Sequence, residues 1–140
     1  MNAFGLAFHH LGLATKTPAL AAGFLKGLGY RIGPEMFDPQ QNVNLMMCEH
    51  TTMPAVEIIS PAGGKGPVSG LLATHSSGLI YHSCFTTDDL KASLQKLENA
   101  GLRILCVAPP KPALLFEERA VSFYQINGFG LIEILETRVS

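Results

Sequence analysis

One pattern occurs twice in this sequence at a nearly constant spacing. His10 and His82 each lie in a short run typical of a β-strand, and they are 72 positions apart. The same separation relates Gly29 to Gly101, and each of these glycines follows a segment with apolar residues at helical spacing. Fixed internal spacing indicates a duplicated unit, so we expect the chain to fold as two copies of one motif.

Each copy ends on a glutamate inside an apolar run. Glu57 stands in Ala-Val-Glu-Ile-Ile and Glu133 in Leu-Ile-Glu-Ile-Leu, 76 positions apart. The second copy has therefore gained a few residues, and we predict that they form a loop in the proline-rich segment 109–112. The order of elements in each copy is strand, helix and three strands. We predict an α+β fold in which two βαβββ modules form a curved mixed sheet around a cleft.

The predicted modules cover about residues 6–60 and 78–138, and the Gly- and Pro-rich segment 61–77 connects them within a single domain of residues 1–140. Local signals support this assignment: an N-cap and a proline at Thr17-Pro18, an acidic cap at Asp88 or Asp89, and the hairpin pair Asn127-Gly128.

Composition excludes several classes of function. A formal net charge of −1 gives no electrostatic case for nucleic acid or an anionic membrane surface. No apolar run approaches the roughly 20 residues of a membrane span, and the N-terminus lacks the layout of a signal peptide. Cys48, Cys84 and Cys106 have no metal-like spacing, which is typical of reduced thiols. We therefore predict a cytoplasmic protein that binds neither nucleic acid nor membrane.

The two glutamates and two histidines predict a metal site. An ionised carboxylate in the middle of an apolar strand is costly to bury unless a positive charge pairs with it. Strand alternation places His10, Glu57, His82 and Glu133 on the concave face. One divalent ion held by these four ligands satisfies both carboxylates, and Co, Ni, Mn, Zn or Fe suits such a set. A single buried histidine is more often structural than metal-binding, and Glu133 alone could pair with Arg119 or Arg138, so the repetition carries the argument.

The sequence resembles the vicinal oxygen chelate superfamily (glyoxalase/bleomycin resistance/dioxygenase) over nearly its whole length. Within that superfamily it is most similar to methylmalonyl-CoA epimerases. The matching segments are His10-Leu11-Gly12-Leu13-Ala14, Gly66-Pro67-Val68-Ser69, Gly78-Leu79-Ile80-Tyr81-His82, Asp88-Asp89-Leu90 and Leu131-Ile132-Glu133-Ile134.

The resemblance implies the glyoxalase-like fold and metal binding by His10, Glu57, His82 and Glu133. It also implies a homodimer. Such epimerases often carry Gln where Glu57 stands, whereas glyoxalase I carries Glu there. The epimerases also carry a glutamate, one of two bases, at a place that Asn44 holds here. Asparagine cannot take up a proton at neutral pH, so we expect Glu133 to be the single base.

These features predict a metal-dependent isomerase or epimerase that acts on an α-acidic acyl thioester such as an acyl-CoA. The metal would stabilise an enolate, and Glu133 would be the catalytic base. The residues predicted to bind substrate are Asn44, Met46, Ser122 and Tyr124. Lys65, Lys111 and Arg119 are candidate partners for a phosphate of the carrier.

Two other functions stay open at this point. The first is a lyase of glyoxalase I type, and the second is a non-catalytic small-molecule-binding protein with the same fold. An iron dioxygenase is less compatible, because it needs open metal positions and Glu57 would fill one of them. Fold alone does not choose between these functions.

Overall fold

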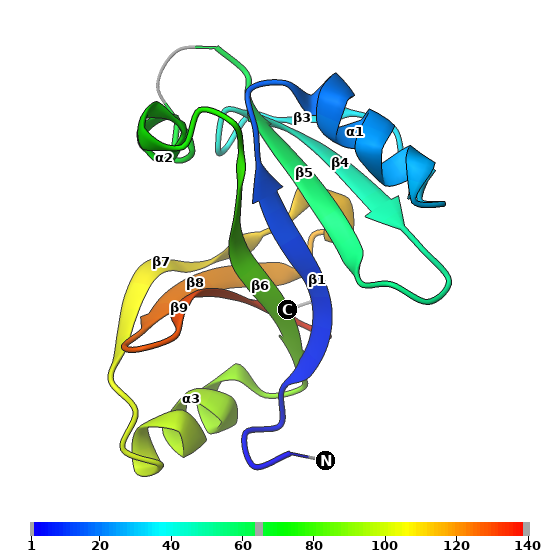
Figure 1. Ribbon diagram of the computed structural model, residues 1–140. Helices are drawn as coiled ribbons and strands as arrows, with labels where there is room; N and C mark the ends of the chain where they lie inside the picture. Colours follow the sequence, from blue (N-terminus) through cyan, green and yellow to red (C-terminus); the bar gives the residue numbers. More distant parts are fainter. Residues whose placement is uncertain (1, 64–65, 139–140) are drawn as a thin grey trace. The chain divides into compact units, whose positions relative to one another are not determined.

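The computed structural model describes residues 2–63 and 66–138 and divides the chain into two compact units. We call residues 10–81 the first unit, and residues 1–9 together with 82–140 the second unit. The elements follow one another as β1 (Ala7–Ala14), α1 (Pro18–Gly27), β2 (Arg31–Ile32), β3 (Met36–Asp38), β4 (Val43–Glu49), β5 (Ala55–Pro61), α2 (Ser69–Thr74), β6 (Leu79–Thr87), α3 (Leu90–Asn99), β7 (Ile104–Pro112), η1 (Leu114–Phe116), β8 (Ala120–Ile126) and β9 (Gly130–Glu136) (Figure 1).

In the first unit the strand order is β2-β4-β5-β1, and β3 also pairs with β4. Strands β1 and β5 are parallel, and the other pairs are antiparallel. Helix α1 packs on this sheet through Leu25, which lies in one core cluster with Tyr30, Cys48, Val56 and Ile58. Every second residue of β4 and β5 therefore faces the helix, and the residues between them face the other side.

The second unit repeats this design in the order β6-β9-β8-β7. Strands β6 and β9 are parallel, whereas β8 pairs antiparallel with both β9 and β7. Helix α3 covers one face through a cluster of Leu97, Tyr124, Ile126, Ile132 and Ile134. The predicted fold of two modules with mixed strand pairing is thus confirmed: the second module is βαβββ, and the first has the same order with one additional short strand, β3.

The helix ends follow the sequence signals. Asp89 caps α3 by accepting a hydrogen bond from the backbone N–H of Ala92 at 3.0 Å, whereas Thr17 makes no such side-chain bond at α1. Gly29 and Gly101 follow their helices with φ of 99° and 82°, which lies in the left-handed region that glycine adopts without strain.

The predicted loop at 109–112 is instead part of β7, and this prediction was wrong. Strand β7 pairs only with β8, and the pairing shifts register between Cys106 and Ala108 and again between Ala108 and Lys111. Proline lacks the N–H that a central strand needs, but an edge strand with bulges tolerates it. The bulges and η1 absorb the additional residues of the second copy.

No helix in the part of the chain that the structure describes is both long and apolar enough to cross a membrane.

Candidate metal centre

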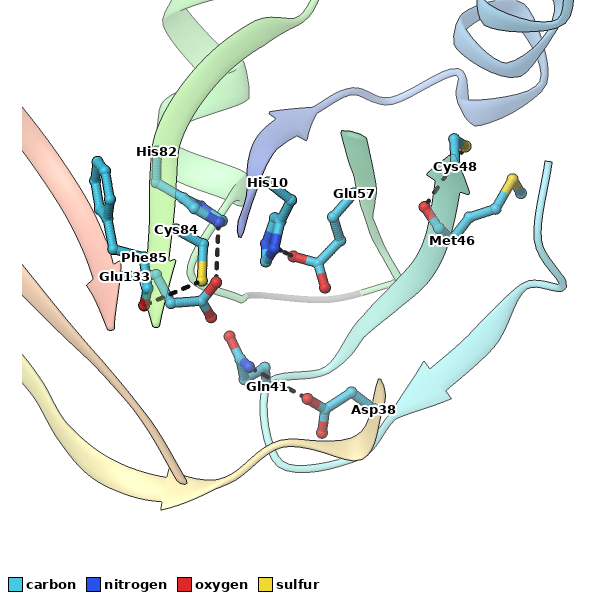
Figure 2. A network of polar contacts seen from close by, with 10 residues as sticks. All are labelled: His10, Asp38, Gln41, Met46, Cys48, Glu57, His82, Cys84, Phe85 and Glu133. Atoms are coloured by element: carbon cyan, nitrogen blue, oxygen red, sulfur yellow. Dashed lines mark hydrogen bonds and ion pairs between the residues drawn. The ribbon is translucent and has the colours of Figure 1, made fainter. Parts of the chain in front are cut away.

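The parallel strands β1 and β5 bring His10 and Glu57 together in the first unit. Gly12 pairs with Glu57 in the ladder, and His10 lies two residues before Gly12, on the same face. The distance from His10 Nε2 to Glu57 Oε1 is 3.5 Å. Both residues are buried, with exposed fractions of 0% and 4%. Figure 2 shows their side chains pointing toward one another.

Strands β6 and β9 form the equivalent pair in the second unit. Cys84 pairs with Glu133, and His82 lies two residues before Cys84. His82 Nε2 lies 3.2 Å from Glu133 Oε1, and both residues are buried (Figure 2). In both pairs the histidine lies two residues before the residue that pairs with the glutamate in a parallel ladder. This common geometry is the structural counterpart of the 72-residue repeat. Glu133 pairs with His82, so the alternative in which an arginine is its partner is not needed.

Each pair fits two neighbouring positions in the shell of a divalent metal. With metal–ligand distances of about 2.1 Å, adjacent ligands lie about 3.0 Å apart in an octahedron and about 3.4 Å apart in a tetrahedron. The observed separations of 3.5 Å and 3.2 Å are close to these values. A neutral imidazole and a carboxylate are suitable donors for the metals named above. An ion pair that holds two strands together has similar distances, so geometry alone permits both interpretations.

Phe123 is a neighbour of the second pair that the sequence did not predict. It lies opposite Glu133 in the β8–β9 ladder. Its ring meets the His82 imidazole edge to face, with the ring centroids 5.4 Å apart and the planes at 84°. This contact limits rotation of the imidazole and excludes water from one side of it. The residue opposite Glu133 can be found by counting back along both strands from the hairpin turn, but this count needs the length of the turn.

Ser122 and Tyr124, which the sequence predicts to bind substrate, do not lie on the face that carries Glu133. These residues lie opposite Ile134 and Ile132, so they face the other way, and Tyr124 belongs to the core under α3. Burial raises the pKa of the Tyr124 phenol, which keeps the group protonated at neutral pH.

Asn44 and Met46 of the first unit likewise do not lie on the face that carries Glu57. They lie opposite Ser60 and Ile58, and Met46 packs against the core under α1. The residue opposite Glu57 is Met47. All four residues predicted to bind substrate thus lie on the faces that carry α1 and α3, and their role in substrate binding stays a prediction.

The three candidate phosphate partners gain little support. Lys65 lies outside the described residues. Lys111 lies on the edge strand β7 opposite Val121, and the Arg119 guanidinium donates to the Phe116 carbonyl at 3.0 Å.

The model of the glyoxalase/bleomycin resistance protein/dioxygenase superfamily matches residues 9–123. The match covers most of both modules and includes His10, Glu57 and His82. The chain belongs to this superfamily.

Several relatives are epimerases. The chain is 29% identical over 106 residues to the ethylmalonyl-CoA/methylmalonyl-CoA epimerase of Cereibacter sphaeroides, covering 74% of this chain and 77% of the relative. It is 26% identical over 100 residues to the human mitochondrial methylmalonyl-CoA epimerase, covering 69% of this chain but only 55% of that protein.

Solved structures of such epimerases share the fold. The enzyme from Mycobacterium tuberculosis superposes with a TM-score of 0.78 at 16% identity, covering 99% of this chain and 93% of that one. A variant of the Streptomyces coelicolor enzyme in complex with 2-nitronate-propionyl-CoA gives a TM-score of 0.71 at 19% identity, covering 96% and 99%. The predicted glyoxalase-like fold is confirmed.

Proposed function

We propose that this protein is a metal-dependent epimerase or isomerase that acts on an acyl-CoA thioester with an acidic α-carbon. The observation that carries the proposal is the pair of buried His–Glu contacts, made by the same strand relationship in both units. The family and the names of the relatives support the choice of reaction, and the acyl-CoA analogue in the Streptomyces coelicolor complex supports the choice of carrier.

His10, Glu57, His82 and Glu133 together hold one divalent ion in this proposal. Either pair alone would supply two protein ligands, whereas protein metal sites generally use three or four. When bound, such an ion withdraws charge from a carbonyl oxygen and makes the neighbouring C–H bond more acidic.

Glu133 carries the α-proton. Its carboxylate is buried next to His82 and Phe123, so it is poorly hydrated and held in one orientation. A positioned carboxylate of this kind contributes about 10²- to 10⁴-fold to a proton transfer. His10, Glu57 and His82 would hold the ion, and Glu133 is the one residue of the four that we propose to exchange the proton.

The first experiment measures metal content by elemental mass spectrometry after purification without chelator or affinity metal. The wild type, His10→Ala, His82→Ala and the control His75→Ala are compared, because His75 is exposed and outside both pairs. We expect about one ion per chain in the wild type and the control, and almost none in the other two variants. Two ions in the wild type, with one retained in each variant, would contradict the shared site. No ion after incubation with Co, Ni, Mn or Zn would overturn the metal-dependent reaction.

The second experiment measures exchange of the α-proton of methylmalonyl-CoA in deuterated water by mass spectrometry. We expect the metal-loaded wild type to exchange it, and Glu133→Gln to exchange it at least about 100-fold more slowly. Metal occupancy is measured in parallel, so that loss of the ion is distinguished from loss of the base. Undiminished exchange in a metal-loaded Glu133→Gln variant would remove Glu133 from this role.

A lyase of glyoxalase I type is the second candidate. The contact of Glu57 with His10 supports Glu57 as a metal ligand. A glutamate at this position is the feature by which the sequence resembles glyoxalase I and not the many epimerases that carry Gln there. Conversion of the hemithioacetal of methylglyoxal and glutathione, without exchange of the α-proton of methylmalonyl-CoA, would select this function. A homodimer remains a prediction, and light scattering of the purified protein tests it.

A further inference from the structure

A cavity of about 410 Å³ lies in the second unit, on the face of the sheet that α3 covers. Ile132 lines it, whereas Glu133, the next residue of β9, points to the opposite face. The same alternation on β6 separates Phe85, which lines the cavity, from Cys84. The cavity is therefore separate from the proposed metal centre. Its volume falls within the range of about 300–1,000 Å³ that is typical of small-molecule sites.

Three segments that are distant in the sequence form the walls of this cavity. Phe4 and Leu6 come from the segment before β1, Leu102 follows α3, and Phe129 lies in the turn between β8 and β9. Eight of the described lining residues have large apolar side chains, three of them phenylalanine, and none of the described lining residues is charged. Such a lining disfavours a charged ligand, which would lose its hydration without gaining a partner.

Hydrogen bonds hold the N-terminal wall in place. The Asn2 side-chain oxygen accepts from the Phe4 N–H at 3.0 Å and from the Leu6 N–H at 3.2 Å. The buried Ser93 hydroxyl of α3 donates to the Phe4 carbonyl at 2.8 Å, and it lies 2.7 Å from the Thr87 hydroxyl. Because these contacts already fix the wall, little conformational freedom is lost when a ligand binds.

Two of the apolar side chains that line the cavity are exposed to water. Phe129 has an exposed fraction of 66% and Leu102 one of 36%. Gly128 and Gly130 on either side of Phe129 have φ of 87° and 122°, a conformation that glycine adopts without strain, so the turn is built to present this ring. A ligand in the cavity would remove part of both side chains from water, which is the main favourable contribution to binding.

We infer that this cavity binds an uncharged aromatic molecule of about two fused rings. Aromatic rings pack favourably against one another, and three phenylalanines line the site. At about 30 Å³ for each water-sized group, the volume of about 410 Å³ holds roughly a dozen non-hydrogen atoms. Asn127 also lines the cavity and is exposed, so its amide can pair with one hydroxyl of such a ligand.

The test uses 2-naphthol and 2-naphthoate, which share a ring system but differ in charge at neutral pH. Calorimetric titration of the full chain measures both dissociation constants. We expect one 2-naphthol per chain, and binding of 2-naphthoate at least about tenfold weaker, because the described lining offers no charged partner for its carboxylate. Absence of 2-naphthol binding, or equal binding of the two probes, would overturn the inference.

Variants at the mouth decide whether the probe binds in this cavity. Leu102→Asp introduces a carboxylate into the wall and should weaken 2-naphthol binding at least about tenfold. Leu105→Asp is the matched control, since Leu105 is 67% exposed on β7 and does not line the cavity. Phe129→Ala should weaken binding about two- to tenfold, so the test does not depend on one variant. Binding that survives both cavity variants, or that is lost equally in L105D, would overturn the inference.

A second copy of the chain is the alternative occupant of this apolar site. Light scattering with and without 2-naphthol distinguishes the two. We expect the probe to leave the oligomeric state unchanged. A dimer that 2-naphthol dissociates would mean that copies of the chain meet at this face, and the small-molecule site would be overturned. None of these measurements involves the metal, so their outcome is independent of the proposed function.

Discussion

Phe123 contacts the second His–Glu pair and is not itself a proposed ligand, so its contact can be removed without removing a ligand. Residues that hold a metal-bound imidazole in place typically affect metal affinity by 10- to 100-fold. We expect Phe123→Ala to weaken metal binding about tenfold, because the His82 ring loses the edge contact that limits its rotation. Competition with a chelator of known affinity measures the change.

Phe129→Ala is the matched control, since it removes the same side chain from a position with a 66% exposed fraction on the same hairpin. It should leave the affinity unchanged. Equal effects of the two variants would mean that lost stability, and not the contact with His82, weakens binding.

Sequence reasoning selected the four residues that form the two His–Glu pairs, whereas the residues opposite Glu57 and Glu133 depend on the lengths of two turns. A two-residue turn at Asn127-Gly128 would put Ser122 opposite Glu133, but the loop also includes Phe129, so Phe123 takes that place. Since side chains alternate along a strand, a shift of one residue exchanges the two faces.

The same shift explains the first unit. A turn that spans residues 49–54 would put Met46 opposite Glu57, whereas β4 continues to Glu49 and Met47 takes that place. The prediction for the histidines and glutamates did not depend on these turns, because alternation along a strand decides which face each of its residues occupies. Turn length depends on local backbone conformations that a single sequence specifies weakly.

At the scale of elements, the two helices have the same place in their modules but different N-terminal caps. Asp89 accepts a hydrogen bond from the first turn of α3, and Thr17 makes no such bond at α1. Loss of a capping side chain costs about 1 kcal/mol. We expect Asp89→Ala to lower the free energy of unfolding by about that amount, and Thr17→Ala to lower it by a few tenths at most.

Urea unfolding followed by circular dichroism measures both variants. Because the two substitutions occupy equivalent positions, their difference isolates the capping bond from the general effect of an alanine. If Thr17→Ala destabilised the protein as much as Asp89→Ala, the hydroxyl would have a role at α1 that its contacts with Thr15 do not explain.

At the scale of the whole molecule, the proposed shared ion couples metal binding to folding. The unfolded chain cannot hold ligands from β1, β5, β6 and β9 together, so the ion binds the native state selectively. A free metal concentration 100-fold above the dissociation constant then adds about 2.7 kcal/mol to the free energy of unfolding. For a chain of this size we expect Co²⁺ or Zn²⁺ to raise the melting temperature by roughly 5–10 °C.

The variants decide whether one ion serves both pairs. With a shared ion, His10→Ala and His82→Ala should each abolish the whole shift, although they lie in different units. With two independent ions, each variant would retain part of it. Mg²⁺ at the same concentration is the control, since it prefers oxygen ligands and should produce no comparable shift. A shift that persists in both variants would mean that the stabilising ion binds elsewhere on the chain.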